Sequence, residues 1–92
     1  MRRVVNGYSM ISARREGEIF GQQLKAMRLK RGLSQQTVAE RCGSNYPYIS
    51  ELERGLKVPT LTMILRLASA LECRVRDLVG VFDMASPDSF LQ

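Results

Sequence analysis

The stretch Ser34–Gly55, SQQTVAERCGSNYPYISELERG, decides the fold. Ser34 is a good N-cap for a first short helix, and Gly43 ends that helix because glycine adopts the left-handed conformation without steric cost. Asn45 caps a second helix, and Pro47 fits its opening turn because backbone N–H groups there have no intrahelical partner. These residues predict two short helices joined by a tight turn.

The second of these helices has two chemically different faces. Ile49 and Leu52, three positions apart, form an apolar face that packs inward. The remaining surface carries side chains that can hydrogen-bond outside the domain, namely Tyr46, Tyr48, Ser50 and Arg54. Two helices held at a fixed angle, with polar groups on the second, are typical of a helix-turn-helix that reads DNA.

A helix is also expected before this stretch, over Ile19–Arg31. Phe20, Leu24 and Met27 follow the i, i+4, i+7 spacing of an inward face, and Gly32 supplies a stop. The preceding residues, 1–18, show no sustained period and are predicted to form a flexible basic leader. An alternative is an arm that touches phosphate or a minor groove through its arginines, Arg2, Arg3, Arg14 and Arg15.

Two more helices are expected after this stretch. Thr60 caps an amphipathic helix whose inward stripe is predicted to be Leu61, Ile64, Leu65, Ala68 and Leu71. A short fifth helix, from about Val75 to Val79, turns Val75 and Leu78 inward. Nothing calls for a strand, so the fold class is all-α with five helices. The domain is placed at residues 19–80 and a C-terminal tail at 81–92.

Length, composition and charge suit one small domain. The chain has 92 residues, of which 45% are hydrophobic and 25% charged, as in ordinary globular proteins. No apolar run reaches the roughly 18–20 residues needed to span a bilayer, and no secretory signal is evident, so we expect a cytoplasmic protein with no membrane partner. Fourteen basic and nine acidic residues give a charge of +5, with the basic excess in the N-terminal third, next to the proposed reading helix. Such a field attracts polyanions, although the same charges would equally form a solvated face.

The residues needed for catalysis or for metal binding are scarce. The chain has no histidine, no paired-carboxylate motif and no glycine-rich phosphate loop, so we do not expect an enzyme. The two cysteines, Cys42 and Cys73, are expected to be reduced and packed, because two distant cysteines make a poor metal site and a sparse disulfide framework. We expect neither a metal nor a cofactor.

Three segments together carry a resemblance to a known family. They are IFGQQLKAMRLKRGLSQQTVAERCG, YISELERG and VPTLTMILRLASAL, within residues 19–80. The chain resembles the lambda/434-repressor-like helix-turn-helix proteins, also called the Cro/C1 or XRE type. The resemblance implies a compact five-helix domain that binds a double-stranded DNA operator, usually as a two-fold homodimer, and regulates transcription.

The resemblance also implies roles for particular residues. Gln35, with Gln36 beside it, would hold a phosphate at the start of the second helix. Residues of the reading helix, about 45–54, would enter the major groove, with Tyr46 and Ser50 reading bases and Asn45 and Tyr48 contacting either bases or phosphate. Basic residues that follow, Arg54 and Lys57, would meet the DNA backbone. Arg28 and Glu53 would form a buried structural ion pair that ties the first helix to the end of the third.

The chain departs from the family pattern at three positions. Ser44 stands where an aliphatic residue usually packs against Ile49, so that contact is lost. Glu72 stands where glycine usually follows the fourth helix, and a glutamate is strained in a left-handed cap. Pro47 replaces a position that often reads a base, so readout there must be apolar, as with a thymine methyl group.

Other assignments stay open at this point. An antitoxin-type or other protein-interaction module would use the same fold, instead of or in addition to binding DNA. Val79, Val81 and Phe82 extend an apolar run that closes the core or forms a dimer seam. Within the family, phage or plasmid repressors, restriction–modification controllers and antitoxins all fit, and the operator sequence cannot be deduced.

Overall fold

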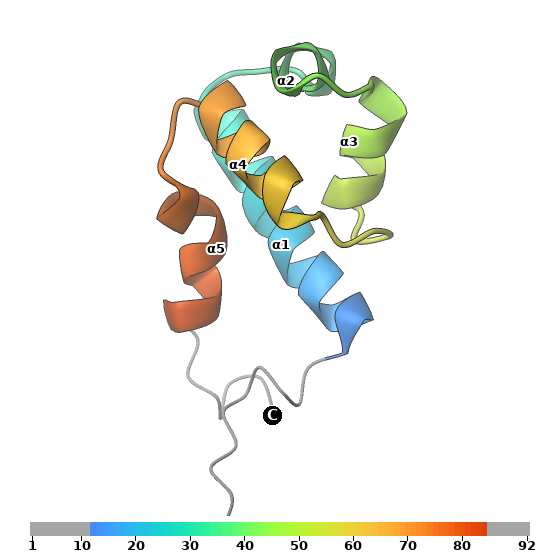
Figure 1. Ribbon diagram of the computed structural model, residues 1–92, viewed down its shortest axis with the longest axis vertical. Helices are drawn as coiled ribbons and strands as arrows, with labels where there is room; N and C mark the ends of the chain where they lie inside the picture. Colours follow the sequence, from blue (N-terminus) through green and yellow to red (C-terminus); the bar gives the residue numbers. More distant parts are fainter. Residues whose placement is uncertain (1–11, 85–92) are drawn as a thin grey trace, which may run out of the picture.

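Five helices make up the part of the chain that the computed structural model describes, residues 12–84 (Figure 1). They are α1 Ala13–Lys30, α2 Gln35–Cys42, α3 Tyr46–Glu53, α4 Leu61–Ala70 and α5 Val75–Met84. No strand occurs within these described residues. The predicted all-α class and the number of helices are confirmed.

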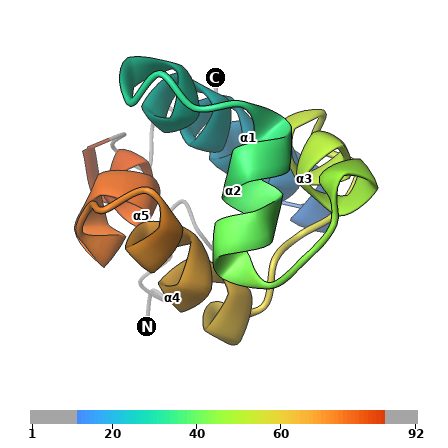
Figure 2. The ribbon, with the colours of Figure 1, turned by 90° about the horizontal axis from the view of Figure 1, so that it is seen from above.

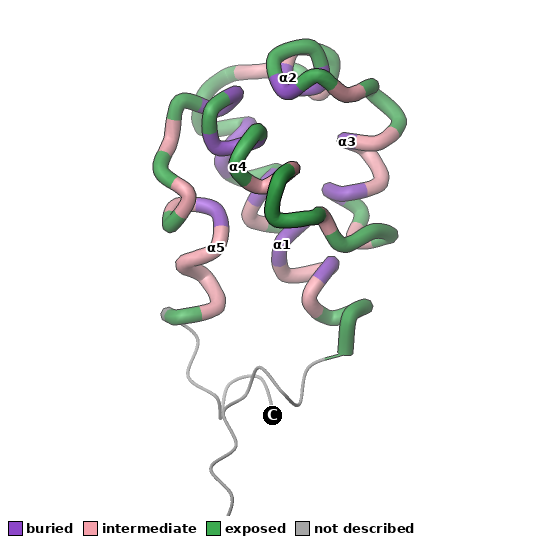
Figure 3. Tube along the Cα trace, in the orientation of Figure 1, coloured by how far each residue is buried: buried purple, intermediate pink, exposed green. Residues whose placement is uncertain are grey.

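The helices form a bundle in which α1 is the longest. α1 contacts α3 and α5, α2 contacts α3 and α4, and α4 contacts α5. Seen from above, α2 crosses the end of the bundle, with α3 on one side of it and α5 on the other (Figure 2). The buried stretches of all five helices face the centre (Figure 3). This arrangement places α3 at one flank of the domain, away from α5.

The three predicted N-caps of α2, α3 and α4 are all present. The Ser34 hydroxyl and the Asn45 side-chain carbonyl accept hydrogen bonds from the third residue of α2 and of α3, at 3.0 Å and 2.9 Å. Thr60 caps α4 in the same way, at 3.1 Å. Each bond satisfies a backbone N–H that the helix itself leaves unpaired. The boundaries of α2, α3 and α4 are therefore set by local sequence.

The turn between α2 and α3 is closed by a left-handed glycine. Gly43 has φ of 73°, and the next amide, that of Ser44, donates to the carbonyl oxygen of Ala39 at 2.8 Å. This is the hydrogen bond by which a glycine cap satisfies the last free carbonyls of a helix. The predicted turn is confirmed, without the aliphatic contact that Ser44 cannot make.

α1 begins six residues earlier than the predicted Ile19. Ser12 caps it by accepting a hydrogen bond from the Arg15 amide at 3.1 Å. Arg14 and Arg15 lie in its first turn and pair with Glu18 at 3.6 Å and 3.3 Å, so residues 12–18 do not belong to a flexible leader. These i, i+3 and i, i+4 ion pairs support a helical turn that apolar periodicity does not show. The remainder of the predicted leader, with Arg2 and Arg3, lies outside the described residues.

The inward face of α4 was only partly predicted. Ala68 and Leu71 are buried as expected, but Leu61 is 69% exposed and Leu65 is 49% exposed. Leu67 is fully buried in their place, together with Ala70. Apolar residues flank the buried face of α4 on both sides, so periodicity alone does not decide which of them point toward α2 and α5.

α5 is longer than predicted and ends at Met84 instead of Val79. Leu78 is fully buried and Val75 is half-buried, as expected. Val81 and Phe82, which we expected to open the C-terminal tail, are helical, and residues 85–92 lie outside the described part. Among the described residues, no helix is long and apolar enough to cross a membrane.

α4 ends at a glutamate in the left-handed region, as the departure from the family pattern implies. Glu72 has φ of 53° and is the one described residue other than glycine with a positive φ. The Cys73 amide donates to the Ala68 carbonyl oxygen at 3.0 Å, which is the hydrogen bond of a glycine-type cap. Glu72 therefore takes the conformation that a glycine cap would take, at a steric cost that glycine would not carry.

Candidate nucleic-acid interface

α3 presents an outward stripe opposite its buried face. Ile49, Leu52 and Glu53 are buried, which fixes the side of the helix that faces the domain. Residues spaced i, i+4 and i+7 share one side of a helix, and the set opposite the buried face is Pro47, Glu51 and Arg54. Pro47 and Arg54 are exposed and Glu51 is half-exposed. This stripe is the part of α3 most accessible to a macromolecule.

The predicted base-reading residues lie at the N-terminal end and on the flank of this stripe. Tyr46, the first residue of α3, is 50% exposed, and Ser50 is half-buried. Asn45 is exposed, but its side-chain carbonyl oxygen already accepts the capping hydrogen bond. The side-chain NH₂ group of Asn45 therefore remains available as a hydrogen-bond donor.

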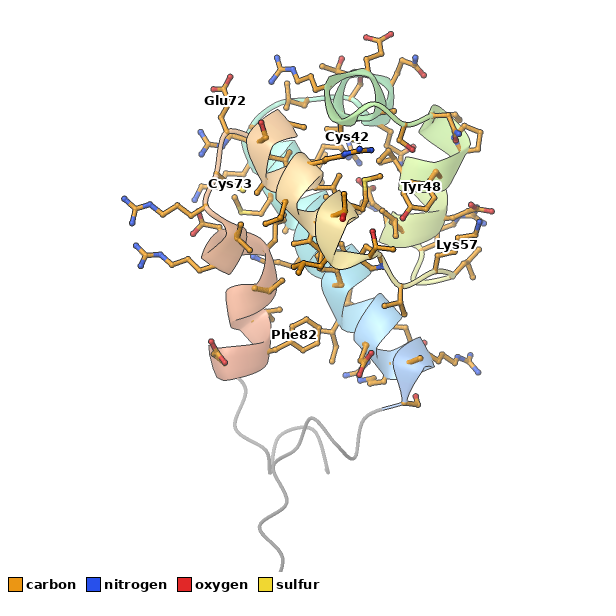
Figure 4. All side chains as sticks on the ribbon, in the orientation of Figure 1. Cys42, Tyr48, Lys57, Glu72, Cys73 and Phe82 are labelled. Atoms are coloured by element: carbon orange, nitrogen blue, oxygen red, sulfur yellow. The ribbon has the colours of Figure 1, made fainter. Side chains whose placement is uncertain are left out.

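Tyr48 and Lys57 lie beside one another at α3 (Figure 4). The Lys57 ammonium is 5.8 Å from the centroid of the Tyr48 ring, which is within the range of a cation–π contact. The same ammonium is 3.3 Å from a carboxylate oxygen of Glu51. Partial burial raises the pKa of Tyr48, so its hydroxyl remains protonated. Lys57 thus bridges two residues of α3 from the connector that follows it.

Glu51 is absent from the DNA-contacting residues predicted from sequence. Helical spacing from the buried Ile49 and Leu52 places it on the outward stripe, and that signal was available in the sequence. Its negative charge sets it apart from the basic and neutral side chains that the sequence predicts for DNA contact.

The other side of α3 is fixed to α1 by a buried ion pair. Arg28 Nε donates to one carboxylate oxygen of Glu53 at 2.6 Å, and Arg28 Nη2 donates to the other at 3.0 Å. The side chains are 10% and 3% exposed. Hydrogen bonding to Glu53 raises the pKa of Arg28, and this effect is larger than the lowering caused by burial. Arg28 and Glu53 form the structural pair that the family resemblance implies.

Gln35 belongs to the same cluster. Its side-chain amide donates to Glu53 Oε1 at 2.9 Å, and Arg28 Nη1 donates to the Leu33 carbonyl oxygen at 2.9 Å. Every buried side-chain polar atom in the described part has a partner. Gln36, one residue further, is exposed and donates to Glu40 at 3.1 Å. Of the two glutamines predicted to hold phosphate, Gln35 thus also supports the ion pair.

A close approach of backbones sets the distance between α1 and α3. A Cβ atom placed on Gly21 would overlap the carbonyl oxygen of Leu52 and lie 2.8 Å from that of Glu53. Only glycine allows this approach. The position of α3 relative to α1 therefore depends on Gly21 as well as on the Arg28–Glu53 pair.

The basic residues at the end of α1 do not lie beside α3. Lys30 and Arg31 line a cleft together with Arg76 of α5. Because α5 and α3 lie on opposite sides of the domain, the expectation that the N-terminal basic excess adjoins the reading helix is wrong for these two residues (Figures 1 and 2). Lys30 and Arg31 are near the helix-turn-helix in sequence, but α1 is long enough to carry its C-terminal end past the core.

The two cysteines are free thiols, as expected. Cys42 is 3% exposed and its thiol donates to the Ala39 carbonyl oxygen at 3.6 Å, whereas Cys73 is half-buried. Burial raises the pKa of both thiols. In the described part of the chain, no group of three or more acidic or cysteine side chains is arranged to hold a metal ion.

Known proteins share this sequence pattern and fold. A model of the helix-turn-helix family matches residues 24–78. The HTH-type transcriptional regulator y4dJ of Sinorhizobium fredii is 37% identical over 54 residues, which are 59% of this chain and 70% of that protein. Control protein C.BamHI of Bacillus amyloliquefaciens is 36% identical over 62 residues, covering 66% of this chain and 76% of that protein.

A solved structure extends the likeness to three dimensions. The restriction-modification controller protein C.AhdI from Aeromonas hydrophila is 40% identical, with a TM-score of 0.66, over 67% of this chain and 94% of that one. Some relatives are much longer: the chain covers 10% of the propionyl-CoA carboxylase regulator of Cereibacter sphaeroides. Because the matched residues make up more than half of its length, the chain belongs to the helix-turn-helix family of Cro/C1-type DNA-binding transcriptional regulators, which are not enzymes.

Proposed function

We propose that this regulator binds double-stranded DNA sequence-specifically, as a homodimer on a two-fold symmetric operator. The observation that carries this proposal is the division of α3 into two faces. One face is held to α1 by the Arg28–Glu53 pair and by the backbone contact at Gly21. The other carries the exposed Pro47 and Arg54, with Glu51 half-exposed between them. A helix whose buried face is fixed to the domain and whose opposite face is open to solvent suits insertion into a major groove.

Contacts to bases and to phosphates come from different parts of this surface. Tyr46 and Ser50 read bases, because they lie at the start and on the flank of the exposed side of α3. Arg54 and Lys57 follow the helix and meet phosphates, where a cation adds affinity without sequence information. Asn45 and Tyr48 lie between these groups and complete the contacts.

The start of α2 supplies a further phosphate contact. Gln35 and Gln36 occupy its first turn, where backbone N–H groups and the helix dipole favour an anion. The hydrogen bond from Gln35 to Glu53 links this turn to the ion pair behind α3. One cluster thus orients both the phosphate-binding turn and the reading helix.

An apolar surface away from α3 supports pairing of two copies. Val79 and Phe82 line a groove of about 280 Å³ together with Phe20, Val58 and Ile64. Phe82 points from α5 toward α1 (Figure 4). The exposed side chains Leu61 and Leu65 of α4 add apolar area. Exposed apolar area of this kind marks interaction sites, and a two-fold pair would place half-sites roughly 34–36 Å apart.

The test is selection of randomised duplexes by the purified protein, followed by sequencing, at two salt concentrations. A palindrome with half-sites one helical turn apart is the expected result. Sedimentation of the protein with a selected duplex should show two chains per duplex. Recovery of no motif, with only a steep and sequence-independent salt dependence, would contradict the proposal and direct attention to a protein partner.

A further inference from the structure

We propose that Glu51 is a specificity-determining residue that accepts a hydrogen bond from the N4 amino group of a cytosine in each half-site. This inference rests on the proposed function, because it requires α3 to lie in the major groove. It adds a residue that neither the sequence pattern nor the family resemblance assigned.

The first argument is position. Glu51 lies one helical turn after Pro47 and one turn before Arg54, in the middle of the outward stripe of α3. Its side chain is 34% exposed. Pro47 has no N–H or O–H group to offer, so Glu51 is the hydrogen-bonding side chain nearest the centre of this stripe. A group at that place meets base edges before it meets the phosphates at the groove rims.

The second argument is charge. A carboxylate on a DNA-facing surface repels phosphates, so it lowers affinity for DNA of every sequence. It becomes favourable only where the DNA offers a hydrogen-bond donor. In the major groove these donors are the exocyclic amino groups of cytosine and adenine. The negative charge of Glu51 therefore favours selectivity at the expense of general affinity.

The donor pattern of the bases separates cytosine from adenine. Adenine presents its N6 amino group beside the N7 acceptor. A carboxylate that accepts from N6 is therefore repelled by the lone pair on N7. Cytosine presents its N4 amino group beside the C5–H edge, which carries no acceptor. A carboxylate has acceptor sites only, so it matches cytosine better.

The third argument is that Lys57 holds the carboxylate in place. The Lys57 ammonium is 3.3 Å from Glu51 Oε1 and stacks over the Tyr48 ring at 5.8 Å. With one carboxylate oxygen engaged by Lys57, the other is left to accept from a base. Lys57 is thus a positioning residue for Glu51 in addition to its proposed contact with phosphate.

The experiment repeats the duplex selection with Glu51→Ala, Glu51→Gln and Lys57→Ala, and then measures binding to the selected operator and to its cytosine-to-thymine derivative. The matched control is Glu72→Gln, which removes the same charge from a side chain at the end of α4, away from Lys57 (Figure 4). Thermal melts of all four variants check that they are folded.

We expect the wild-type motif to contain a cytosine that Glu51→Ala no longer prefers, with discrimination against thymine reduced about tenfold or more. Glu51→Gln should bind random DNA more tightly and shift the preference toward adenine, because an amide pairs with adenine N6 and N7. Lys57→Ala should weaken the preference at the same position, which the loss of a phosphate contact alone would not do. Glu72→Gln should select the wild-type motif.

Two outcomes would overturn the inference, and they are distinguishable. If the wild type selects a motif and both Glu51 variants select the same one, Glu51 reads no base and the proposed function stands. If the wild type selects no motif at all, the proposed function fails and the role of Glu51 fails with it.

Discussion

Arg28 and Glu53 lie 25 residues apart in sequence and meet through two parallel charge-assisted hydrogen bonds, of 2.6 Å and 3.0 Å. The planar guanidinium fork fits the two carboxylate oxygens, so this contact fixes direction as well as distance. It joins the last turn of α1 to the last residue of α3. The orientation of α3, the proposed reading helix, is therefore set from its buried side by this ion pair.

Arg28→Ala should lower the free energy of unfolding by about 3–5 kcal/mol, because it leaves the Glu53 carboxylate buried without its main partner. Urea denaturation measures this loss. Lys30→Ala, an exposed position on the same helix, is the control and should change stability little. DNA affinity of Arg28→Ala should fall only to the extent that the folded fraction falls. A large loss of affinity in fully folded protein would assign Arg28 to the DNA contact instead.

Gly21→Ala should destabilise the domain by about 1–3 kcal/mol or more, because the added methyl group overlaps the backbone at the end of α3. Gly80→Ala is the matched control, since a Cβ there meets nothing within 4 Å. That change should stabilise α5 by about 0.5–1 kcal/mol, as glycine is a poor helix former. Thermal melts of both variants separate the packing effect at Gly21 from the effect of helix propensity. Equal effects in the two variants would show that the approach of α1 to α3 is not tight.

Glu72→Gly should raise stability by about 1 kcal/mol, because it removes the cost of a left-handed glutamate, less the extra freedom that glycine gives the unfolded chain. Glu72→Ala loses the same exposed carboxylate but keeps a Cβ, so it should give no such gain. The weak pair with Arg41, at 4.0 Å on the surface, contributes little to either result. Chemical denaturation of the two variants makes the comparison, and a gain in the alanine variant would argue against strain.

Arg54→Ala should weaken binding to operator and random duplexes about equally and reduce the slope of log K against log salt by about one, as expected for loss of one phosphate contact. Tyr46→Ala and Ser50→Ala should instead reduce the ratio of operator to random binding. Fluorescence anisotropy at several salt concentrations measures both quantities. A changed base preference in Arg54→Ala would reverse these assignments.

Cys42 should resist alkylation in the folded protein, whereas Cys73 should react. Cys42 is buried, and the pKa of its thiol is raised by that burial, so little thiolate forms and little reagent reaches it. Because the folded pKa is raised, ionisation of Cys42 opposes folding, and stability should fall as the pH rises above the ordinary thiol pKa near 9. Iodoacetamide labelling followed by mass spectrometry, with and without urea, gives the rates. Rapid labelling of Cys42 in native protein would indicate local opening around α2.

Local sequence determined the boundaries of the middle helices. Ser34, Asn45 and Thr60 each cap a helix through one hydrogen bond to a backbone N–H three residues away, and Gly43 closes the turn between two of them. Such signals depend only on nearby residues, so they can be found without knowing the fold. The start of α1 was missed because its first turns are held by ion pairs, which apolar periodicity does not register.

Tertiary structure decided which surfaces are free. The sequence showed that α4 is amphipathic, but only packing against α2 and α5 chose Leu67 for the core and left Leu61 exposed. The tertiary structure also places Lys30 and Arg31 away from α3, and it brings the Lys57 ammonium into an ion pair with Glu51. The sequence by itself determined the five-helix fold and the faces of α3, because capping and helical periodicity act over a few residues. The neighbours of each face were decided only in three dimensions, because packing joins residues that are far apart in the chain.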